Sequence, residues 1–185
     1  MNVFMHVSRL TQYPDGYVLI LSKGLNFRQH SWLNILGGFM DKDFANHIET
    51  MFSEGISVHG SNYLFEGLYG DISYSSWALE MCFESIRFKE FSNRPSRLQS
   101  AFAWRDLADA QNFRKNLDCD IYAVEPLDTV AFLDMNLITG DKKLFGGAED
   151  NAKAYWSGTK PEVQGYTPVI EVVMKCPVRI LGKVT

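Results

Sequence analysis

The sequence has 185 residues, of which 46% are apolar and 14% aromatic, and its formal net charge is -4. This composition excludes a disordered, collagen-like or disulfide-stabilised chain and predicts one folded domain over residues 1–185. The negative charge provides no general attraction to nucleic acid or to anionic membranes. Because the three cysteines lack metal-ligand spacing and no apolar run is long enough to span a bilayer, we expect a cytoplasmic protein without a membrane segment.

The first part of the chain predicts two short strands, a turn and a helix. Residues 3–7 are apolar apart from His6, which favours a strand. A Pro-Asp-Gly run at residues 14–16 is typical of a tight turn, and residues 17–21 predict the next strand. Helical spacing of apolar residues then predicts a helix over residues 43–53.

The second part of the chain is predicted to hold most of the secondary structure. Residues 60–76 carry three glycines and little periodicity, which favours a surface loop that acts as a lid. After this loop we expect, in order, a helix from residue 76 or 77 to the break at residues 93–95, a strand at 98–104, a helix at 107–117 capped by Asp106, strands at 121–124 and 130–133, and a short helix at 148–157. Because strands and helices do not alternate, we predict an α+β domain built on small sheets.

The chain closes with two apolar segments on either side of Cys176 and Pro177. Residues 169–174 are β-branched or apolar apart from Glu171, and residues 178–184 continue the pattern. Proline breaks the run, so we expect either a β-hairpin or a sharply bent pair of strands. Strand alternation points Glu171 to solvent unless its carboxylate is held inward for chemistry, and the sequence leaves both interpretations open.

Common catalytic motifs are absent from the sequence. It contains no GxxxxGKS/T, GxGxxG, HExxH or GxSxG pattern, so P-loop, dinucleotide-fold, zincin and serine-hydrolase interpretations lose their main support. The four histidines and three cysteines show no spacing typical of a metal site. Candidate chemistry therefore has to come from polar residues scattered along the chain.

Four groups of polar and aromatic residues remain as candidates. They lie at the end of the first strand, around the start of a middle strand, at the end of the short helix and in the closing strands: His6, Ser8 and Arg9; Ser96, Arg97, Ser100 and Phe102; Tyr155 to Gly158; and Glu171. Each group also has an ordinary structural interpretation, which is a packed strand-end histidine, surface arginines, aromatic packing at a helix end and an outward carboxylate.

Taken together and in this order, these residues resemble the ADP-ribosyltransferase superfamily, in particular a bacterial and phage-associated branch with a start similar to Phe4-Met5-His6-Val7-Ser8-Arg9. The resemblance implies an α+β fold in which two small packed β-sheets, flanked by helices, form a cleft that binds NAD as a substrate. It also implies roles for the site residues. Glu171 and His6 would be catalytic, and contacts to NAD would come from His6, Ser8, Arg9, Arg97, Ser100, Phe102 and Tyr155.

The chemistry of NAD cleavage suits these residue types. Breaking the N-glycosidic bond between nicotinamide and ribose develops positive charge at the sugar carbon. We expect Glu171 to stabilise that charge and to accept a hydrogen bond from the ribose 2′-hydroxyl, and His6 to contact the other ribose. Arg9 or Arg97 suits the pyrophosphate, because a guanidinium matches phosphate geometry at two points. Stacking on nicotinamide or adenine would come from Phe102, Trp104, Tyr155 or Trp156.

Two departures from the family pattern leave the acceptor open. Many members that modify protein or guanine carry a second glutamate or glutamine where this chain has Val169, and residues 98–104 contain no tyrosine. The resemblance implies a macromolecular acceptor, and we favour nucleic acid, RNA or DNA, over protein, although the acidic composition argues against this preference. It also implies the toxin of a toxin–antitoxin or phage-defence system, with an antitoxin protein as its partner. The alternatives are an NAD glycohydrolase and a non-catalytic binding module on the same scaffold.

Overall fold

The computed structural model describes residues 2–8, 12–23, 49–66, 74–115, 118–138 and 147–185. Within them the strands are β1 (Phe4–Ser8), β2 (Val18–Leu19), β3 (Ser100–Ala103), β4 (Asp120–Pro126), β5 (Val130–Asp134), β6 (Ile170–Lys175) and β7 (Val178–Lys183). The α-helices are α2 (Val58–Ser61), α4 (Tyr74–Glu90), α5 (Leu107–Arg114) and α6 (Ala148–Ser157). A π-helix, η2 (Asn62–Glu66), and two 3-10 turns, η3 (Arg97–Gln99) and η4 (Met135–Leu137), complete the described elements.

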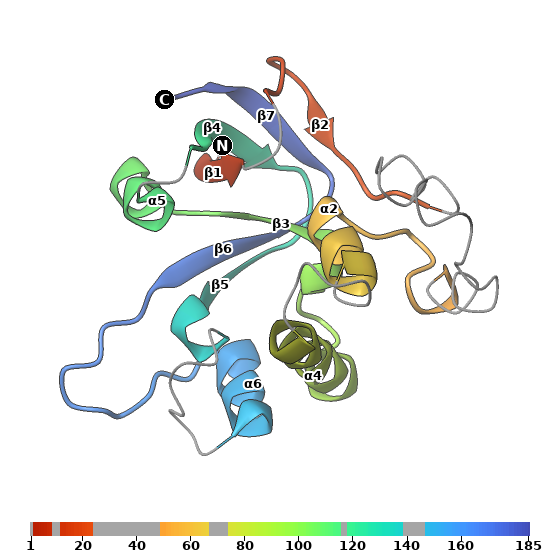
Figure 1. The fold of residues 1–185 in the computed structure, drawn as a ribbon, viewed down its shortest axis with the longest axis vertical. Helices are drawn as coiled ribbons and strands as arrows, with labels where there is room; N and C mark the ends of the chain where they lie inside the picture. Colours follow the sequence, from red (N-terminus) through yellow and green to blue (C-terminus); the bar gives the residue numbers. More distant parts are fainter. Residues whose placement is uncertain (1, 9–11, 24–48, 67–73, 116–117, 139–146) are drawn as a thin grey trace.

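The strands form two small antiparallel sheets (Figure 1). One sheet has the order β1-β4-β7-β2 and the other has the order β3-β6-β5. Each of the paired strands runs antiparallel to its neighbour. The predicted α+β class with small sheets is therefore confirmed.

The two sheets meet where β3 leaves β6 and reaches β1. The ladder between β3 and β6 ends at the pair of Ala103 and Val172. At the next residue the backbone of Trp104 exchanges two hydrogen bonds with Met5 of β1, at 2.8 and 2.9 Å. Glu171, the residue before Val172, therefore lies where β3 has turned away from β6.

The closing strands β6 and β7 belong to different sheets. β6 pairs with β3 and β5, whereas β7 pairs with β4 and β2. The chain passes from one sheet to the other at Cys176 and Pro177, which lie between the two strands. Of the two expected arrangements, the hairpin is wrong and the sharply bent pair is confirmed.

The three-stranded sheet is covered on both faces. One face packs on the four-stranded sheet through a cluster that includes Phe4, Ala101, Ala103, Tyr122, Val124, Val172, Met174, Val178 and Ile180. The other face packs on α4 and α6 through Phe83, Ile86, Ala131, Leu133, Tyr155, Trp156 and Val173. Successive residues of a strand point to opposite faces, so β6 contributes to both clusters.

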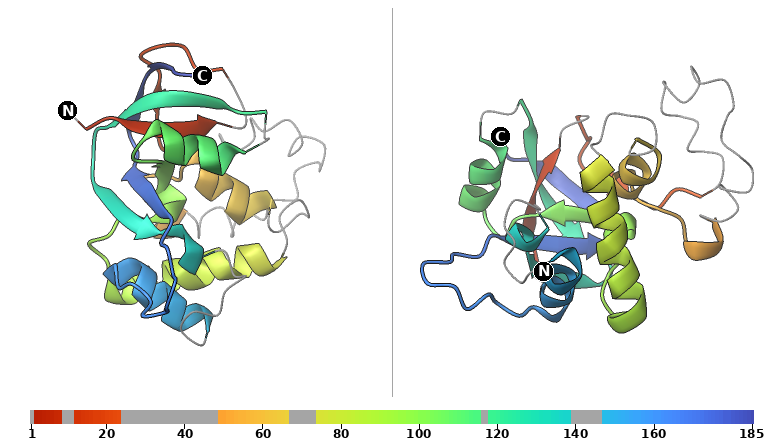
Figure 2. Two further views of the ribbon diagram at one scale, coloured as in Figure 1. Left: turned by 90° about the vertical axis from the view of Figure 1, so that its left-hand side faces the viewer. Right: turned by 60° about the horizontal axis from the view of Figure 1, so that its bottom comes forward.

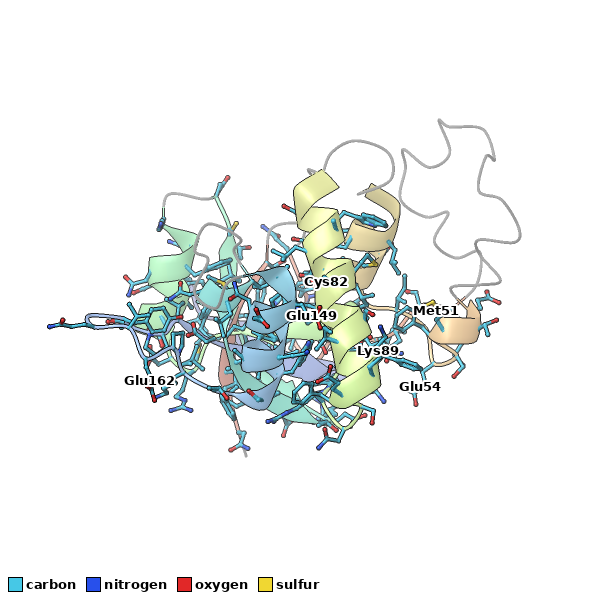
Figure 3. The ribbon with its side chains drawn as sticks, turned by 90° about the horizontal axis from the view of Figure 1, so that it is seen from below. Met51, Glu54, Cys82, Lys89, Glu149 and Glu162 are labelled. Carbon is cyan, nitrogen blue, oxygen red and sulfur yellow. The ribbon has the colours of Figure 1, made fainter. Side chains whose placement is uncertain are left out.

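The helices α4 and α6 lie together on one side of the three-stranded sheet, as two further views show (Figure 2). The indole nitrogen of Trp156 in α6 donates to the Phe83 carbonyl of α4 at 2.8 Å. Seen from below (Figure 3), Lys89 of α4 and Glu149 of α6 are exposed on the outer side of the pair. None of the described helices is long and apolar enough to cross a membrane.

Several local predictions are confirmed by hydrogen bonds. Asp106 caps α5, since its carboxylate accepts from the backbone N–H of Asp109 at 2.9 Å, although the helix ends at Arg114 instead of residue 117. The turn at residues 14–16 is present, with Gly16 at a φ of 78°. The predicted helix at 43–53 is described only from residue 49, and residues 49–51 are helical.

The expected loop at residues 60–76 is partly wrong. Its first residues belong to α2 and to η2, and α4 already begins at Tyr74. Gly60 is required by the packing of this helix, because a Cβ at that position would lie 2.1 Å from the carbonyl oxygen of Leu98. The absence of a side chain lets the α2 backbone approach η3. Residues 67–73, on which the rest of the expected lid falls, lie outside the described residues.

Candidate active site

Arg97 is the centre of a buried cluster of charged side chains. It begins η3, immediately before β3, and its residue is 5% exposed. Its Nε and Nη2 donate to the carboxylate of Glu80 in α4 at 3.0 to 3.1 Å. Its Nη1 donates to Glu171 and to the Tyr155 hydroxyl oxygen, each at 2.5 Å. The guanidinium therefore connects α4, α6 and β6.

Glu171 points inward, and the outward interpretation of this carboxylate is wrong. The residue is 4% exposed and lies on the face of β6 that also carries Val173, towards α4 and α6. Its Oε1 accepts from Nη1 of Arg97 and from the hydroxyl of Tyr155, the latter at 2.7 Å. Within the described residues, no hydrogen bond or ion pair reaches Oε2. One oxygen of the carboxylate is thus fixed by two hydrogen bonds, and the other receives none from the described residues.

The contacts among the residues of this cluster determine which of its groups are charged. Although burial acts against the ionised form, the charge of Arg97 and the contact with His59 lower the pKa of Glu80 to about 2. Burial also opposes the charge of Arg97, but Glu171 and Glu80 raise the pKa of its guanidinium well above the usual value. Burial raises the pKa of Tyr155 well above that of a free phenol, so this hydroxyl keeps its proton. Two carboxylates (-2) and one guanidinium (+1) leave a formal charge of -1.

His6 is connected to the cluster through Phe102. Its Nδ1 lies 2.7 Å from the carbonyl oxygen of Phe102, and because a carbonyl only accepts, Nδ1 carries the proton. Burial lowers the pKa of His6, which favours the neutral ring. Nε2 is then a hydrogen-bond acceptor, and it has no hydrogen-bond partner in the described part of the chain. The ring of Phe102 in turn lies 4.5 Å from the guanidinium carbon of Arg97.

The other predicted site residues have different surroundings. Ser100 is fully buried, and its hydroxyl donates to the backbone of Ser96 at 2.6 Å, so it is not presented to a ligand. Tyr155 is also fully buried and has no exposed ring face for stacking; it holds Glu171 instead. Ser8 ends β1 and is buried. Arg9 lies outside the described residues.

Arg97 does not present its donors to a phosphate in this structure, contrary to the expected grip on the pyrophosphate. Its Nε, Nη1 and Nη2 are directed at Glu80, Glu171 and Tyr155. Instead, its Nη1 holds one oxygen of the Glu171 carboxylate. Among the residues that the structure describes, no group of three or more His, Cys, Asp or Glu side chains is placed to hold a metal ion.

Two members of the cluster, Glu80 and His59, were not anticipated from the sequence. Glu80 falls on the polar side of the α4 pattern, where a carboxylate is normally exposed, yet it is 4% exposed. His59 lies immediately before the expected loop at residues 60–76, in a segment for which the sequence predicted no element, and it belongs to α2. No local sequence signal marks Glu80 as buried. Its burial follows from the contact with Arg97, which only the fold reveals.

Fold and site together define an α+β protein whose two antiparallel sheets meet at β3 and whose buried cluster joins two carboxylates to one guanidinium. The chain belongs to the family described as a protein of unknown function, DUF2441, whose sequence profile matches residues 19–185. The matched region contains Glu80, Arg97 and Glu171 and begins after β1, so His6 lies outside it. A comparison with curated proteins found no match.

Proposed function

We propose that this protein is an NAD-dependent ADP-ribosyltransferase with an ADP-ribosyltransferase-like fold, in which NAD binds where the two sheets diverge. The observation that carries the proposal is the arrangement of Glu171. Arg97 and Tyr155 fix one oxygen of its carboxylate, whereas the other oxygen has no partner among the described residues. A carboxylate held in advance in a single orientation is what the cleavage of a glycosidic bond with cationic character at the sugar carbon requires.

In the proposed reaction, the bond between C1′ of the ribose and the nicotinamide nitrogen breaks. The electron pair stays on the ring, which leaves as neutral nicotinamide. A nucleophile of the acceptor bonds to C1′ and loses its proton to solvent, so the products are nicotinamide, the ADP-ribosylated acceptor and one proton. The surplus negative charge of the cluster formed by Glu80, Arg97 and Glu171 favours the cation that develops at C1′.

Each residue of the site has a distinct role in this reaction. The free Oε2 of Glu171 accepts from the 2′-hydroxyl of the nicotinamide ribose and faces the developing cation. Neutral His6 offers Nε2 to a hydroxyl of the other ribose, because its Nδ1 proton is committed to Phe102. Arg97 is a positioning residue that orients Glu171. The phosphate contact predicted for Arg9 stays a prediction, since Arg9 lies outside the described residues.

The test of the proposal is release of nicotinamide from NAD by the purified chain. Replacing Glu171 by Gln keeps the size of the side chain and removes its charge, so we expect turnover to fall roughly 100- to 1,000-fold. His6→Ala is expected to lower it as well. The matched control is Glu125→Gln, which also removes a carboxylate paired to an arginine, in this case Arg179 at 2.8 Å on the surface, and should leave turnover unchanged. Undiminished turnover in a folded Glu171→Gln protein would reject the assignment.

The acceptor is proposed to be a macromolecule, with RNA or DNA favoured over protein. Transfer of label from isotopically marked NAD to RNA, DNA or lysate protein decides among them. In the setting of a toxin–antitoxin or phage-defence system, a neutralising antitoxin protein would be the partner. Free ADP-ribose formed at full rate without any macromolecule would identify an NAD glycohydrolase instead. No NAD binding in calorimetry, together with tight binding of a protein partner, would identify a non-catalytic binding module.

A further inference from the structure

His59 is a second histidine that the structure brings to the cluster. Its Nε2 lies 3.3 Å from Oε1 of Glu80, and its ring centroid lies 4.6 Å from that of Tyr63 and 4.5 Å from that of Phe102. Because a carboxylate only accepts, the neutral imidazole carries its proton on Nε2 and keeps Nδ1 as the site of proton uptake. The side chain of His59 is 22% exposed and that of Glu80 is 4% exposed. Of these two, His59 is the one in contact with solvent.

The backbone around His59 is fastened directly to the turn that carries Arg97. The amide and the hydroxyl of Ser57, the N-cap of α2, both donate to the carbonyl of Leu98, at 2.9 and 3.1 Å. Gly60 lies against the same carbonyl. The next element, η2, is a π-helix, a structure that occurs frequently at functional sites, and it supplies Tyr63. His59 is therefore held in a defined position relative to Glu80 and Arg97.

The charged and titratable groups around His59 come from three elements. Of the residues described in the structure, these groups are Glu80 on α4, Arg97 on η3 and Tyr63 on η2, whereas Phe102 on β3 is uncharged. Between about pH 5 and pH 8, imidazole is the side chain whose ordinary titration changes its charge. Over that range Glu80 stays ionised, because its pKa is about 2, and Arg97 stays charged, because its pKa is raised. Proton uptake by His59 takes the formal charge of the cluster from -1 to 0.

We propose that His59 is a positioning residue that sets the charge of the candidate active site through Glu80, so that a proton on Nδ1 slows NAD cleavage. This inference rests on the proposed ADP-ribosyltransferase function. With His59 neutral, the charge of Arg97 is shared between Glu80 and Glu171, and negative charge remains for the cation at C1′. With His59 protonated, Glu80 has a second cation beside it, and the cluster offers no surplus negative charge to the substrate.

The pH dependence of NAD cleavage tests this inference. We expect kcat of the wild-type protein to fall roughly tenfold from about pH 8 to about pH 5. In His59→Gln the amide can still donate to Glu80 but does not titrate, so the fall is expected to disappear while KM changes little. The matched control is His6→Gln, which should lower the rate at every pH and keep the fall towards acid.

Glu80→Gln is the second variant, for the case that His59→Gln does not fold. It removes the carboxylate through which His59 contacts Arg97, so the fall towards acid should be lost here too, and thermal unfolding establishes that the variant is folded. A fall as large as in the wild type, in either variant, overturns the role of His59 and leaves the proposed function intact. If the wild type cleaves no NAD at any pH, both the proposed function and this inference are overturned.

Discussion

The two faces of β6 have different roles although they alternate along the same strand. Val172 and Met174 point between the sheets into an apolar core, whereas Val173 and Glu171 point towards α4 and α6, where Glu171 meets the cluster around Arg97. Burial of apolar surface stabilises a fold by about 25 cal/mol per Å². A buried ion cluster seldom stabilises more than apolar residues of similar volume would. Stability therefore explains the apolar residues of both faces, but it does not explain the ion cluster at Glu171 on the face towards α4 and α6, here called the ionic face. This difference supports the proposal of chemistry at Glu171.

The largest effect on the free energy of unfolding is expected when Arg97, the cation of the ionic face, is replaced. Replacing Arg97 by Met keeps an unbranched side chain but leaves Glu80 and Glu171 buried without their shared partner. We expect the free energy of unfolding, measured by urea denaturation near neutral pH, to drop by about 3 to 5 kcal/mol.

The matched control for this change is Arg179→Met in β7. Arg179 pairs with Glu125 at 2.8 Å, a distance typical of a charged hydrogen bond, but its side chain is 46% exposed. Removing an exposed pair of this kind should cost less than about 1 kcal/mol. Equal losses in Arg97→Met and Arg179→Met would contradict the distinction between a buried and a solvated guanidinium.

The apolar face is tested by Met174→Ala. Met174 is fully buried between the sheets, so truncation leaves a cavity and is expected to lower the free energy of unfolding by about 2 to 5 kcal/mol. NAD turnover of the folded variant should stay close to that of the wild type, because the substitution is on the opposite face from Glu171. Glu171→Gln should show the reverse pattern, with lost turnover and a smaller change in stability. A Met174→Ala protein that is stable but inactive would contradict the different roles assigned to the two faces of β6.

Sequence reasoning predicted the apolar face of β6 better than the ionic one. A run of β-branched residues interrupted by Pro177 predicts strands, and Asp106 before an apolar repeat predicts a capped helix, because both signals are local. The partners of Arg97 are not local. Glu80 lies 17 residues before it and Glu171 lies 74 residues after it, and only the packing of α4 against β6 brings the three together.

The same limit explains the errors around α2 and Arg97. Gly60 lowers the helical signal of its segment, and the close approach to Leu98 that makes this glycine necessary is visible only in the folded chain. An arginine near a strand was expected to contact phosphate because an unpaired guanidinium suits an anion. In the structure the guanidinium of Arg97 donates instead to Glu80 and Glu171, two carboxylates from distant elements. Composition showed neither pairing, since it records residue types and not their neighbours.

The smallest effect on the free energy of unfolding is expected when the pH is lowered. This change tests the contribution of the Glu80 charge to the ionic face. The ordinary pKa of this carboxyl is 4.5, and in the folded protein it is about 2. A depressed pKa contributes stability that is fully present above the unfolded value and is lost as the pH falls from about 4.5 towards 2. Other carboxylates also respond to acid, so the quantity to measure is the difference in free energy of unfolding between the wild type and Glu80→Gln. We expect the wild type to be the more stable near pH 7 and the difference to shrink by about pH 3, whereas a difference independent of pH would mean that Glu80 acts through its shape and not its charge.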